Sequence, residues 1–429
     1  MIKKIYLKSD FIKSVAVLMT GTLLAQGLGI LVMPLLTRIY EPEAFGELNI
    51  YMRLIGFVSG VATARFEMSL PLPKYEGHSF LLYELSLRIA AYSLLAMAII
   101  GGLYFLIQPV SVYNISFLLI SIGSTFFVIF INLGTNWSIR KKAFKDISRQ
   151  KIVGSVSSNG LRLLFGYLSF GSLGLLLGTM IGYVVSSVWY IRDFVNLRNR
   201  AYKNYSKKKK KVLVKEYSEF PMVNLPHVSL DLGRELFVAA LVSYHFGLEI
   251  FGLYSVSQMI LKMPLTILGT SIGQVFYGET SQMVNQGKSV YSILRRTILT
   301  LFGLSILPFS LIYFFGEPIF EFILGKDYGP SGYYSEIMAT WLMMVFIVSP
   351  ISNLSLVLRR QKEYFLLGLV GSSIQLFCFG VLPLIYGSGE SVWIFILWVV
   401  TIAQTINFTM VCFVSLYYAK KGAKSITLN

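Results

Sequence analysis

The chain has 429 residues, of which 55% are hydrophobic and only 14% are charged. Soluble domains carry about 25% charged residues, so this composition indicates an integral membrane protein and argues against a soluble enzyme. The net charge of +17 is high enough to suggest nucleic-acid binding. Because no aromatic residues alternate with the basic run Lys207–Lys211, we expect no nucleic-acid partner.

Twelve apolar stretches reach the length of about 20 residues that a membrane-spanning helix needs. They are residues 12–37, 45–70, 80–108, 112–136, 151–169, 172–194, 218–245, 250–276, 294–316, 333–357, 363–386 and 391–418. Six precede a basic stretch and six follow it. The sequence therefore predicts an all-α integral membrane protein with twelve transmembrane helices in two six-helix bundles. The expected domains are an N-terminal lobe, a basic cytoplasmic linker and a C-terminal lobe: 1–194, 195–217 and 218–429.

The basic residues also predict the orientation of the chain. Cytoplasmic loops of membrane proteins are enriched in Lys and Arg. With the N-terminus in the cytoplasm, thirty of the 38 Lys and Arg residues fall on the cytoplasmic side, and only Arg38 and Lys326 fall on the other. We therefore expect both termini to be cytoplasmic. The Lys207–Lys211 run is expected to act as a topological signal that also attracts anionic lipid.

A short polar hinge connects the first two stretches. It runs from Arg38 to Glu47, and Pro42 and Gly46 are its chain-bending residues. Its segment Glu43-Ala-Phe-Gly-Glu-Leu48 aligns with Glu249-Ile-Phe-Gly-Leu-Tyr254, 206 positions later. Because this offset is close to half of the chain, the sequence indicates an internal duplication.

The hinge region carries a family resemblance. The segment Leu35-Leu-Thr-Arg-Ile-Tyr-Glu-Pro-Glu-Ala-Phe-Gly-Glu-Leu48 resembles that of the Wzx oligosaccharide flippases, whose larger group also holds the lipid II flippase and the multidrug/toxic-compound exporters. The resemblance implies a bacterial cytoplasmic (inner) membrane protein with a central cavity and alternating access. The implied substrate is an undecaprenyl-pyrophosphate-linked oligosaccharide, such as an O-antigen or capsule repeat unit. Implied partners are membrane lipids and the polysaccharide polymerase and chain-length machinery.

Six basic residues lie within the predicted spans: Arg53, Arg65, Arg88, Arg162, Arg234 and Lys262. A charge at membrane depth costs about 3 kcal/mol or more, so it normally faces a protein interior or a wet cavity. In the resembled flippases, the first, second, seventh and eighth segments line the cavity. The planar guanidinium group of arginine, here called the arginine fork, can donate two parallel hydrogen bonds to pyrophosphate oxygens. The expected substrate-binding residues are therefore Arg53, Lys262, Arg234, Arg65 and Arg38.

Some of these charges have an alternative interpretation. Arg65 and Arg88 lie near helix ends, where long side chains reach toward the membrane interface. Arg162 is equally well explained as a structural partner of a neighbouring helix. Asp231, Arg234 and Glu235 share one helical face, and they either contribute to the cavity or neutralise one another as a fold contact.

Three acidic residues are candidates for coupling transport to a proton or sodium ion: Asp231, Glu235 and Glu67. In the alternative interpretation, Glu67 simply pairs with Arg65. Pro34 and Pro264 are hinge candidates, because proline removes a backbone hydrogen bond and bends a helix. Bending for packing alone is the alternative for both.

No pattern of an enzyme or a metal site is present. Gly287-Lys288-Ser289 imitates the end of a phosphate-binding loop, but Gln282 stands where that motif requires glycine. The two cysteines and three histidines have no metal-ligand spacing. We therefore expect no catalytic residue, no metal and no cofactor, with transport driven by an ion gradient, the membrane potential or consumption of the product.

Two other functions compete with a flippase. A cation-coupled multidrug exporter of the same superfamily would share the fold, but its cavity should be acidic or neutral to receive organic cations. The excess of basic over acidic residues within the predicted spans argues against it. A non-transporting scaffold of a polysaccharide assembly complex would need the charges only for folding.

Overall fold

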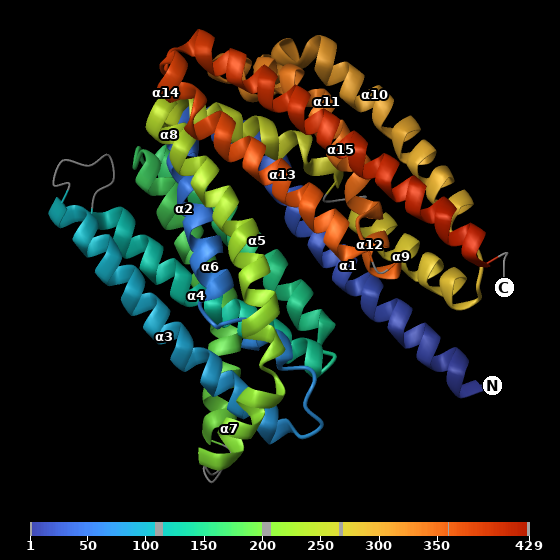
Figure 1. Cartoon of the computed structure of the whole chain (residues 1–429). Helices are drawn as coiled ribbons and strands as arrows, with labels where there is room; N and C mark the ends of the chain where they lie inside the picture. The colour runs from blue at the N-terminus through green and yellow to red at the C-terminus, as the bar shows by residue number, and fades with distance from the viewer. Residues whose placement is uncertain (1, 108–114, 200–206, 266–268, 359, 427–429) are drawn as a thin grey trace. The chain divides into compact units, whose positions relative to one another are not determined.

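A computed structural model gives the structure of the chain and describes residues 2–107, 115–199, 207–265, 269–358 and 360–426 (Figure 1). Helices make up nearly all of this part of the chain, which contains no strand. The all-α prediction is therefore confirmed. Parts of four predicted segments lie outside the described residues: the end of the third span, the start of the fourth, the interior of the eighth and the middle of the linker.

Within the described ranges, nine helices are long and apolar enough to cross a membrane. The difference from twelve has three sources. The second and fifth predicted spans fold as α2 (Pro42–Val61) and α5 (Phe144–Tyr167), which are long enough to span but not apolar enough. The seventh span and the start of the eighth fold as one long element, α8 (Leu225–Leu261). The twelve-helix arrangement in two bundles stays a prediction.

The chain forms two compact units, of which the first comprises residues 1–40 and 47–236. Besides most of α2, α5 and the start of α8, it contains α1 (Ile2–Thr37), η1 (Phe66–Ser69), α3 (Glu76–Ile107), α4 (Ile115–Arg140), α6 (Ser172–Asn199), α7 (Lys207–Glu216) and η2 (Phe220–Asn224). The helix α5 packs against both α1 and α6, and α4 packs against α3 and α6. Leu213 of α7 is buried in the core under α3, so part of the expected linker belongs to this unit.

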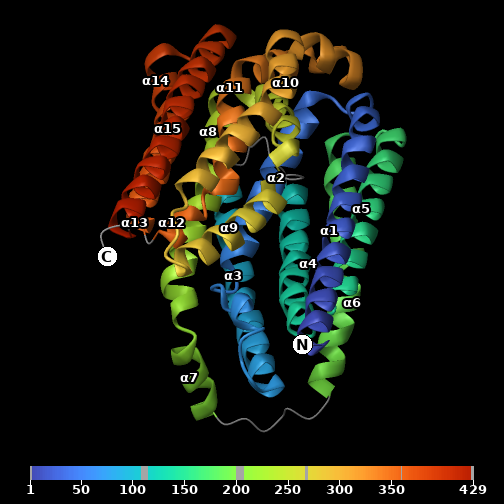
Figure 2. The same cartoon turned by 90° about the vertical axis from the view of Figure 1, so that its right-hand side faces the viewer.

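The second unit comprises residues 41–46 and 237–429. Besides the rest of α8, it contains α9 (Thr270–Asn285), α10 (Tyr291–Leu324), η4 (Lys326–Tyr328), α11 (Gly329–Ile351), α12 (Leu354–Val357), α13 (Gln361–Gly380), α14 (Leu382–Tyr386) and α15 (Glu390–Ile426). The helix α11 packs against α10, α15 and α9, and α13 packs against α15 (Figure 2). Fully buried Trp393 anchors this core, surrounded by the rings of Phe246, Tyr254, Tyr334 and Phe379.

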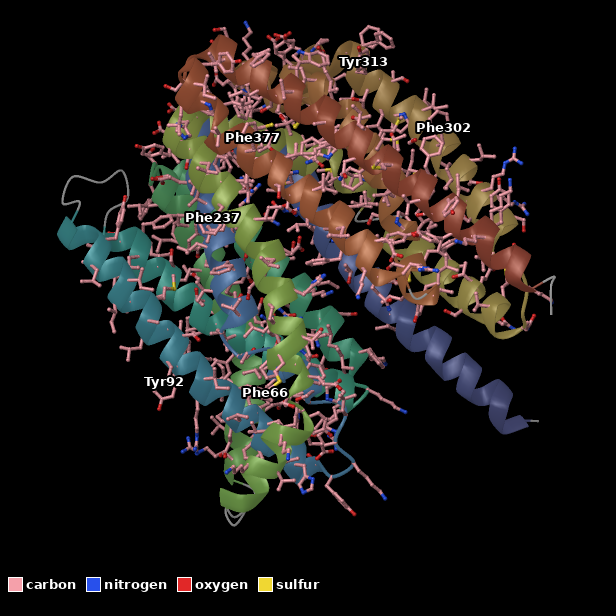
Figure 3. The ribbon with its side chains drawn as sticks, in the orientation of Figure 1. Phe66, Tyr92, Phe237, Phe302, Tyr313 and Phe377 are labelled. Atoms are coloured by element: carbon pink, nitrogen blue, oxygen red, sulfur yellow. The ribbon has the colours of Figure 1, made fainter. Side chains whose placement is uncertain are left out.

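The outer faces of several long helices are apolar. Tyr92 on α3, Phe302 and Tyr313 on α10 and Phe377 on α13 are all more than 40% exposed, and they are labelled in Figure 3. A soluble protein rarely exposes contiguous apolar surface on this scale. These faces therefore suit contact with the hydrocarbon of a membrane.

The two copies of the repeated motif pack against each other. Gly46 in the first turn of α2 lies against the backbone carbonyl of Leu248, and Gly252 of α8 lies against the backbone carbonyl of Pro42. Each contact maps onto the other by the offset of 206 positions found in the sequence. A Cβ atom on either glycine would collide with backbone atoms, so this close approach requires glycine at both positions.

A glycine also separates the two parts of α8. Gly247 takes φ 88° and ψ 169°, far from helical values, and only glycine adopts this conformation without strain. The helix resumes at Leu248, which corresponds to the first residue of α2 in the repeat. The hinge between the seventh and eighth predicted spans is thus a single glycine, where the first copy of the repeat uses a longer polar connection.

Two helix ends differ from the prediction. The second span was expected to continue to residue 70, but α2 ends at Val61, and Ala64 and Arg65 take left-handed φ angles of 50° and 63°. The following turn η1 then buries Phe66 in the core of the first unit (Figure 3). The eighth span was expected to run to residue 276, but α8 ends at Leu261, and Lys262 forms a turn before Pro264.

Candidate functional site

Four of the predicted site residues meet in the first unit and form what we call the α2–α8 charge cluster: Arg53, Asp231, Arg234 and Glu235. On α2, Arg53 places Nη1 3.2 Å from Oε2 of Glu235 and donates a 2.8 Å hydrogen bond to the backbone carbonyl of the same residue. On α8, Nη2 of Arg234 lies 3.0 Å from Oε1 of Glu235 and 3.2 Å from Oδ1 of Asp231. The Glu235 carboxylate therefore bridges two arginines on two helices.

The cluster is formally neutral and partly accessible. Its two guanidinium groups face two carboxylates, and the exposed fraction of the side chain rises from 16% for Arg53 to 35% for Glu235 and 64% for Asp231. The Nε of Arg234 is buried and has no hydrogen-bond partner in the described part of the chain. The cluster thus combines a pair of arginine forks with one unused donor, and Glu235 occupies the position that a bound anion would compete for.

The spacing of Asp231, Arg234 and Glu235 on one helical turn was visible in the sequence. The contact with Arg53, 182 positions away, was not, because it depends on how α2 packs against α8. Gly60 of α2 lies against the side chain of Leu232, and Gly233 lies against Phe57. These close approaches of the two helices bring their charged side chains within hydrogen-bond reach.

A second ion pair lies in the connection between α2 and α3, outside the helices that are apolar enough to span. Nη1 of Arg65 is 3.1 Å from Oε1 of Glu67, and the Thr63 hydroxyl donates to the other carboxylate oxygen. Glu67 and Thr63 are buried. The pairing of Arg65 with Glu67 matches the alternative interpretation of these two residues, and the local hydrogen bonds compete with continuation of the helix.

Burial raises the pKa of Glu67 above its ordinary value of 4.5, while the hydroxyl of Thr63 and the charge of Arg65 lower it by less. A raised pKa in the folded state means that folding favours the protonated form. The stability that Glu67 contributes is therefore fully present below its ordinary pKa and falls as the pH rises through that value toward the folded pKa.

We accordingly expect wild type to lose thermal stability relative to Glu67→Gln as the pH rises from about 4 to 8, because glutamine keeps an acceptor for Thr63 without a buried charge. Melting temperatures of both purified proteins across this range test the expectation. Glu76→Gln is the matched control, because it removes a carboxylate at the exposed start of α3. A difference between wild type and Glu67→Gln that is the same at every pH would contradict it.

In the second unit, Lys262 ends a line of polar side chains along α8. Its Nζ donates to Oε1 of Gln258 at 2.8 Å, and Nε2 of Gln258 contacts the Tyr254 hydroxyl at 2.5 Å. Tyr254 and Gln258 are buried, whereas Lys262 is half-buried in the turn that follows α8. Sequence reasoning missed Gln258 and Tyr254, although the i, i+4, i+8 spacing with Lys262 indicates one helical face.

The remaining predicted residues are not part of these groups. Arg38 is exposed just after α1, and Pro34 lies within a continuous α1 where the Thr37 hydroxyl bonds to its carbonyl. Pro264 lies beyond the end of α8. Arg162 donates to the hydroxyl of Thr179 at 2.8 and 3.0 Å, a contact within the first unit that fits the structural interpretation.

Comparisons with known proteins give the following matches. Residues 35–332 match the family described as "Polysaccharide biosynthesis protein". The lipid II flippase MurJ in an inward closed conformation superposes with a TM-score of 0.70 at 17% identity, over 96% of this chain and 90% of that chain. A multidrug resistance MATE family transporter of the MOP superfamily gives a TM-score of 0.62 in its inward-facing conformation, at 12% identity over 96% of each chain.

The outward-facing conformation of a MATE family transporter gives a TM-score of 0.52 at 12% identity over 97% of each chain. At these identities the structural likeness shows a shared fold. The comparison with curated proteins gives no match.

Proposed function

This chain belongs to the family of polysaccharide biosynthesis proteins, and on that premise we propose that it is a flippase for a lipid-linked oligosaccharide. The proposed substrate is an undecaprenyl-pyrophosphate-linked repeat unit of an O-antigen or capsule, moved from the cytoplasmic to the periplasmic leaflet of the bacterial inner membrane by alternating access. Three observations support this: the family match, the fold shared with a lipid II flippase, and the arginine forks of the α2–α8 charge cluster.

The α2–α8 charge cluster carries the proposal. A pyrophosphate brings two or more negative charges, and two arginines with an unused Nε–H donor suit its oxygens. In the present conformation, Glu235 holds both Arg53 and Arg234. Binding of substrate would therefore exchange one anion, the Glu235 carboxylate, for another. Lys262 of the second unit is proposed as a further substrate-binding cation.

The same exchange offers a route for coupling to protons. Protonation of Glu235 removes its negative charge and weakens its hold on both arginines, which favours binding of the pyrophosphate. Loss of the proton restores the ion pairs and favours release, so the proton would bind and leave together with the substrate. This linkage moves the proton outward, so it makes substrate affinity depend on pH, and the energy for export would come from the membrane potential or from consumption of the product. Asp231, the more exposed partner of Arg234, is the entry point that we propose for the proton, with sodium as the alternative ion.

A cation-coupled multidrug exporter is the second candidate, because the fold is shared with MATE transporters and because the charge cluster includes two carboxylates. In an exporter, Asp231 and Glu235 would receive the organic cation. The two candidates therefore assign opposite roles to the same four side chains, which a genetic experiment distinguishes.

We would delete the gene in its native bacterium and determine where the lipid-linked repeat unit accumulates. A flippase predicts single repeat units on the cytoplasmic leaflet, with loss of the surface glycan and recovery on complementation. Unchanged surface glycan together with new sensitivity to cationic drugs would contradict the flippase and support the exporter. If the deletion arrests glycan export and the Arg53→Ala and Lys262→Ala variants both restore it in full, the result would support a scaffold instead.

A further inference from the structure

An open cavity of about 550 Å³ lies between α9 and α10 in the second unit. The helix α9 contributes one acidic and one apolar side chain, and α10 contributes one basic side chain, three hydroxyl groups and two apolar side chains. The polar lining residues are Glu279, Ser292, Arg296, Thr297 and Thr300. None of them belongs to the α2–α8 charge cluster or to the Lys262 line, so the proposed flippase site leaves this cavity without a role.

The hydroxyl groups of the cavity are available to a ligand. Serine and threonine inside a helix usually donate to a carbonyl one turn back, as Thr280 of α9 and Ser305 of α10 do. The hydroxyls of Ser292, Thr297 and Thr300 make no such hydrogen bond within the described part of the chain. Ser292 and Thr300 stand with Arg296 in one i, i+4, i+8 row along α10, Thr297 flanks this row, and all four line the cavity.

The cavity also carries one charge of each sign. Arg296 of α10 and Glu279 of α9 both line it, and neither forms an ion pair with another described residue. Two opposite charges, each without a partner, fit a ligand that itself carries an anion and a cation. We propose that this cavity binds the headgroup of an amine-bearing phospholipid of the phosphatidylethanolamine class. The phosphate lies against Arg296 and the hydroxyls, and the ammonium lies against Glu279.

The position of the cavity along α10 suits a lipid headgroup. Lys288, Arg295 and Arg296 stand immediately before the long apolar part of α10, where basic residues meet the headgroup layer of a membrane. Further along the same face of α10, one to three turns beyond Thr300, Leu304, Leu307 and Leu311 form an exposed apolar surface. A lipid held by its headgroup in the cavity would lay its acyl chains along this surface.

The balance of charge excludes the pyrophosphate substrate as the occupant. A pyrophosphate needs an excess of positive charge, whereas Arg296 and Glu279 sum to zero, and the Glu279 carboxylate repels a second phosphate. An anionic phospholipid without an amine meets the same repulsion. The zwitterionic headgroup is the one that leaves neither charge unpaired.

The full-length protein, purified in detergent, would be offered phosphatidylethanolamine, phosphatidylcholine or phosphatidylglycerol with identical acyl chains, and bound lipid would be counted by native mass spectrometry. We expect wild type to retain phosphatidylethanolamine in preference to the other two. Arg296→Gln should lower retention about five- to tenfold, because it removes a charge-assisted hydrogen bond to phosphate. Glu279→Gln should leave a bound lipid but abolish the preference for the amine.

Arg295→Gln is the matched control, since it removes the neighbouring exposed arginine that does not line the cavity. Equal retention of the three lipids by wild type would overturn the proposal without reference to any variant. An Arg296→Gln protein that binds lipid as the Arg295→Gln protein does would also overturn it. A preference for phosphatidylglycerol in wild type would replace it with a site for anionic lipid.

Discussion

Replacing Arg53 by alanine is expected to reduce export of the lipid-linked oligosaccharide about ten- to hundredfold. A hydrogen bond to a charged group contributes about 1.5–3 kcal/mol, and each 1.4 kcal/mol corresponds to a factor of ten. The alanine variant loses this contact with the pyrophosphate and also leaves Glu235 without one of its two arginine partners. Lysine at the same position keeps the positive charge but not the arginine fork. Export by Arg53→Lys should therefore lie between that of wild type and that of Arg53→Ala.

The measurement is the amount of surface glycan in the deletion strain complemented by each variant, normalised to the amount of protein in the membrane. Arg88→Ala is the control, because Arg88 is an exposed arginine of α3 outside the charge cluster. It should support export close to the wild-type level. Full export by Arg53→Ala at normal protein levels would show that Arg53 does not hold the substrate.

The second large effect concerns the contact between the two copies of the repeat. Gly252→Ala is expected to destabilise the protein by about 1–3 kcal/mol or more, because its Cβ would overlap the Pro42 carbonyl and backbone cannot move aside as a flexible side chain can. Gly46→Ala should have a similar effect through the carbonyl of Leu248. Thermal unfolding in detergent measures both.

Gly56→Ala is the matched control for these glycine variants. Gly56 also lies in α2, but a Cβ there would meet open space, and alanine is the better helix former by about 1 kcal/mol. We expect this variant to be as stable as wild type or slightly more so. If Gly252→Ala and Gly46→Ala unfolded at the same temperature as Gly56→Ala, the result would contradict the close packing of the two repeat copies.

The sequence predicted helices well and helix ends poorly, and the reason is physical. Apolar runs of about 20 residues identify a long helix wherever its neighbours lie. The end of α2 at Val61 depends instead on tertiary burial of Phe66 and on the local bonds of Glu67, which hydropathy does not register. The break in α8 at Gly247, by contrast, falls between the predicted seventh and eighth spans, which end at residue 245 and begin at residue 250.

The candidate site also has a part that follows from local sequence and a part that depends on tertiary packing. The shared face of Asp231, Arg234 and Glu235 follows from helical spacing alone, and the structure brings them together. The partner of Arg53 lies 182 positions away and depends on the packing of α2 against α8. The duplication provided the strongest long-range information, since the structure places Gly46 against the copy that contains Gly252.

The most direct test of the proposed function is flipping by the purified protein itself. We would reconstitute it into liposomes that contain the undecaprenyl-pyrophosphate-linked oligosaccharide and measure how much of the glycan a membrane-impermeant reagent modifies over time. A flippase predicts that the fraction modified rises from about half, the outer leaflet alone, toward completion, and that Arg53→Ala slows this rise. A fraction that stays at half with wild-type protein, under an imposed proton or sodium gradient of either direction, would contradict the account.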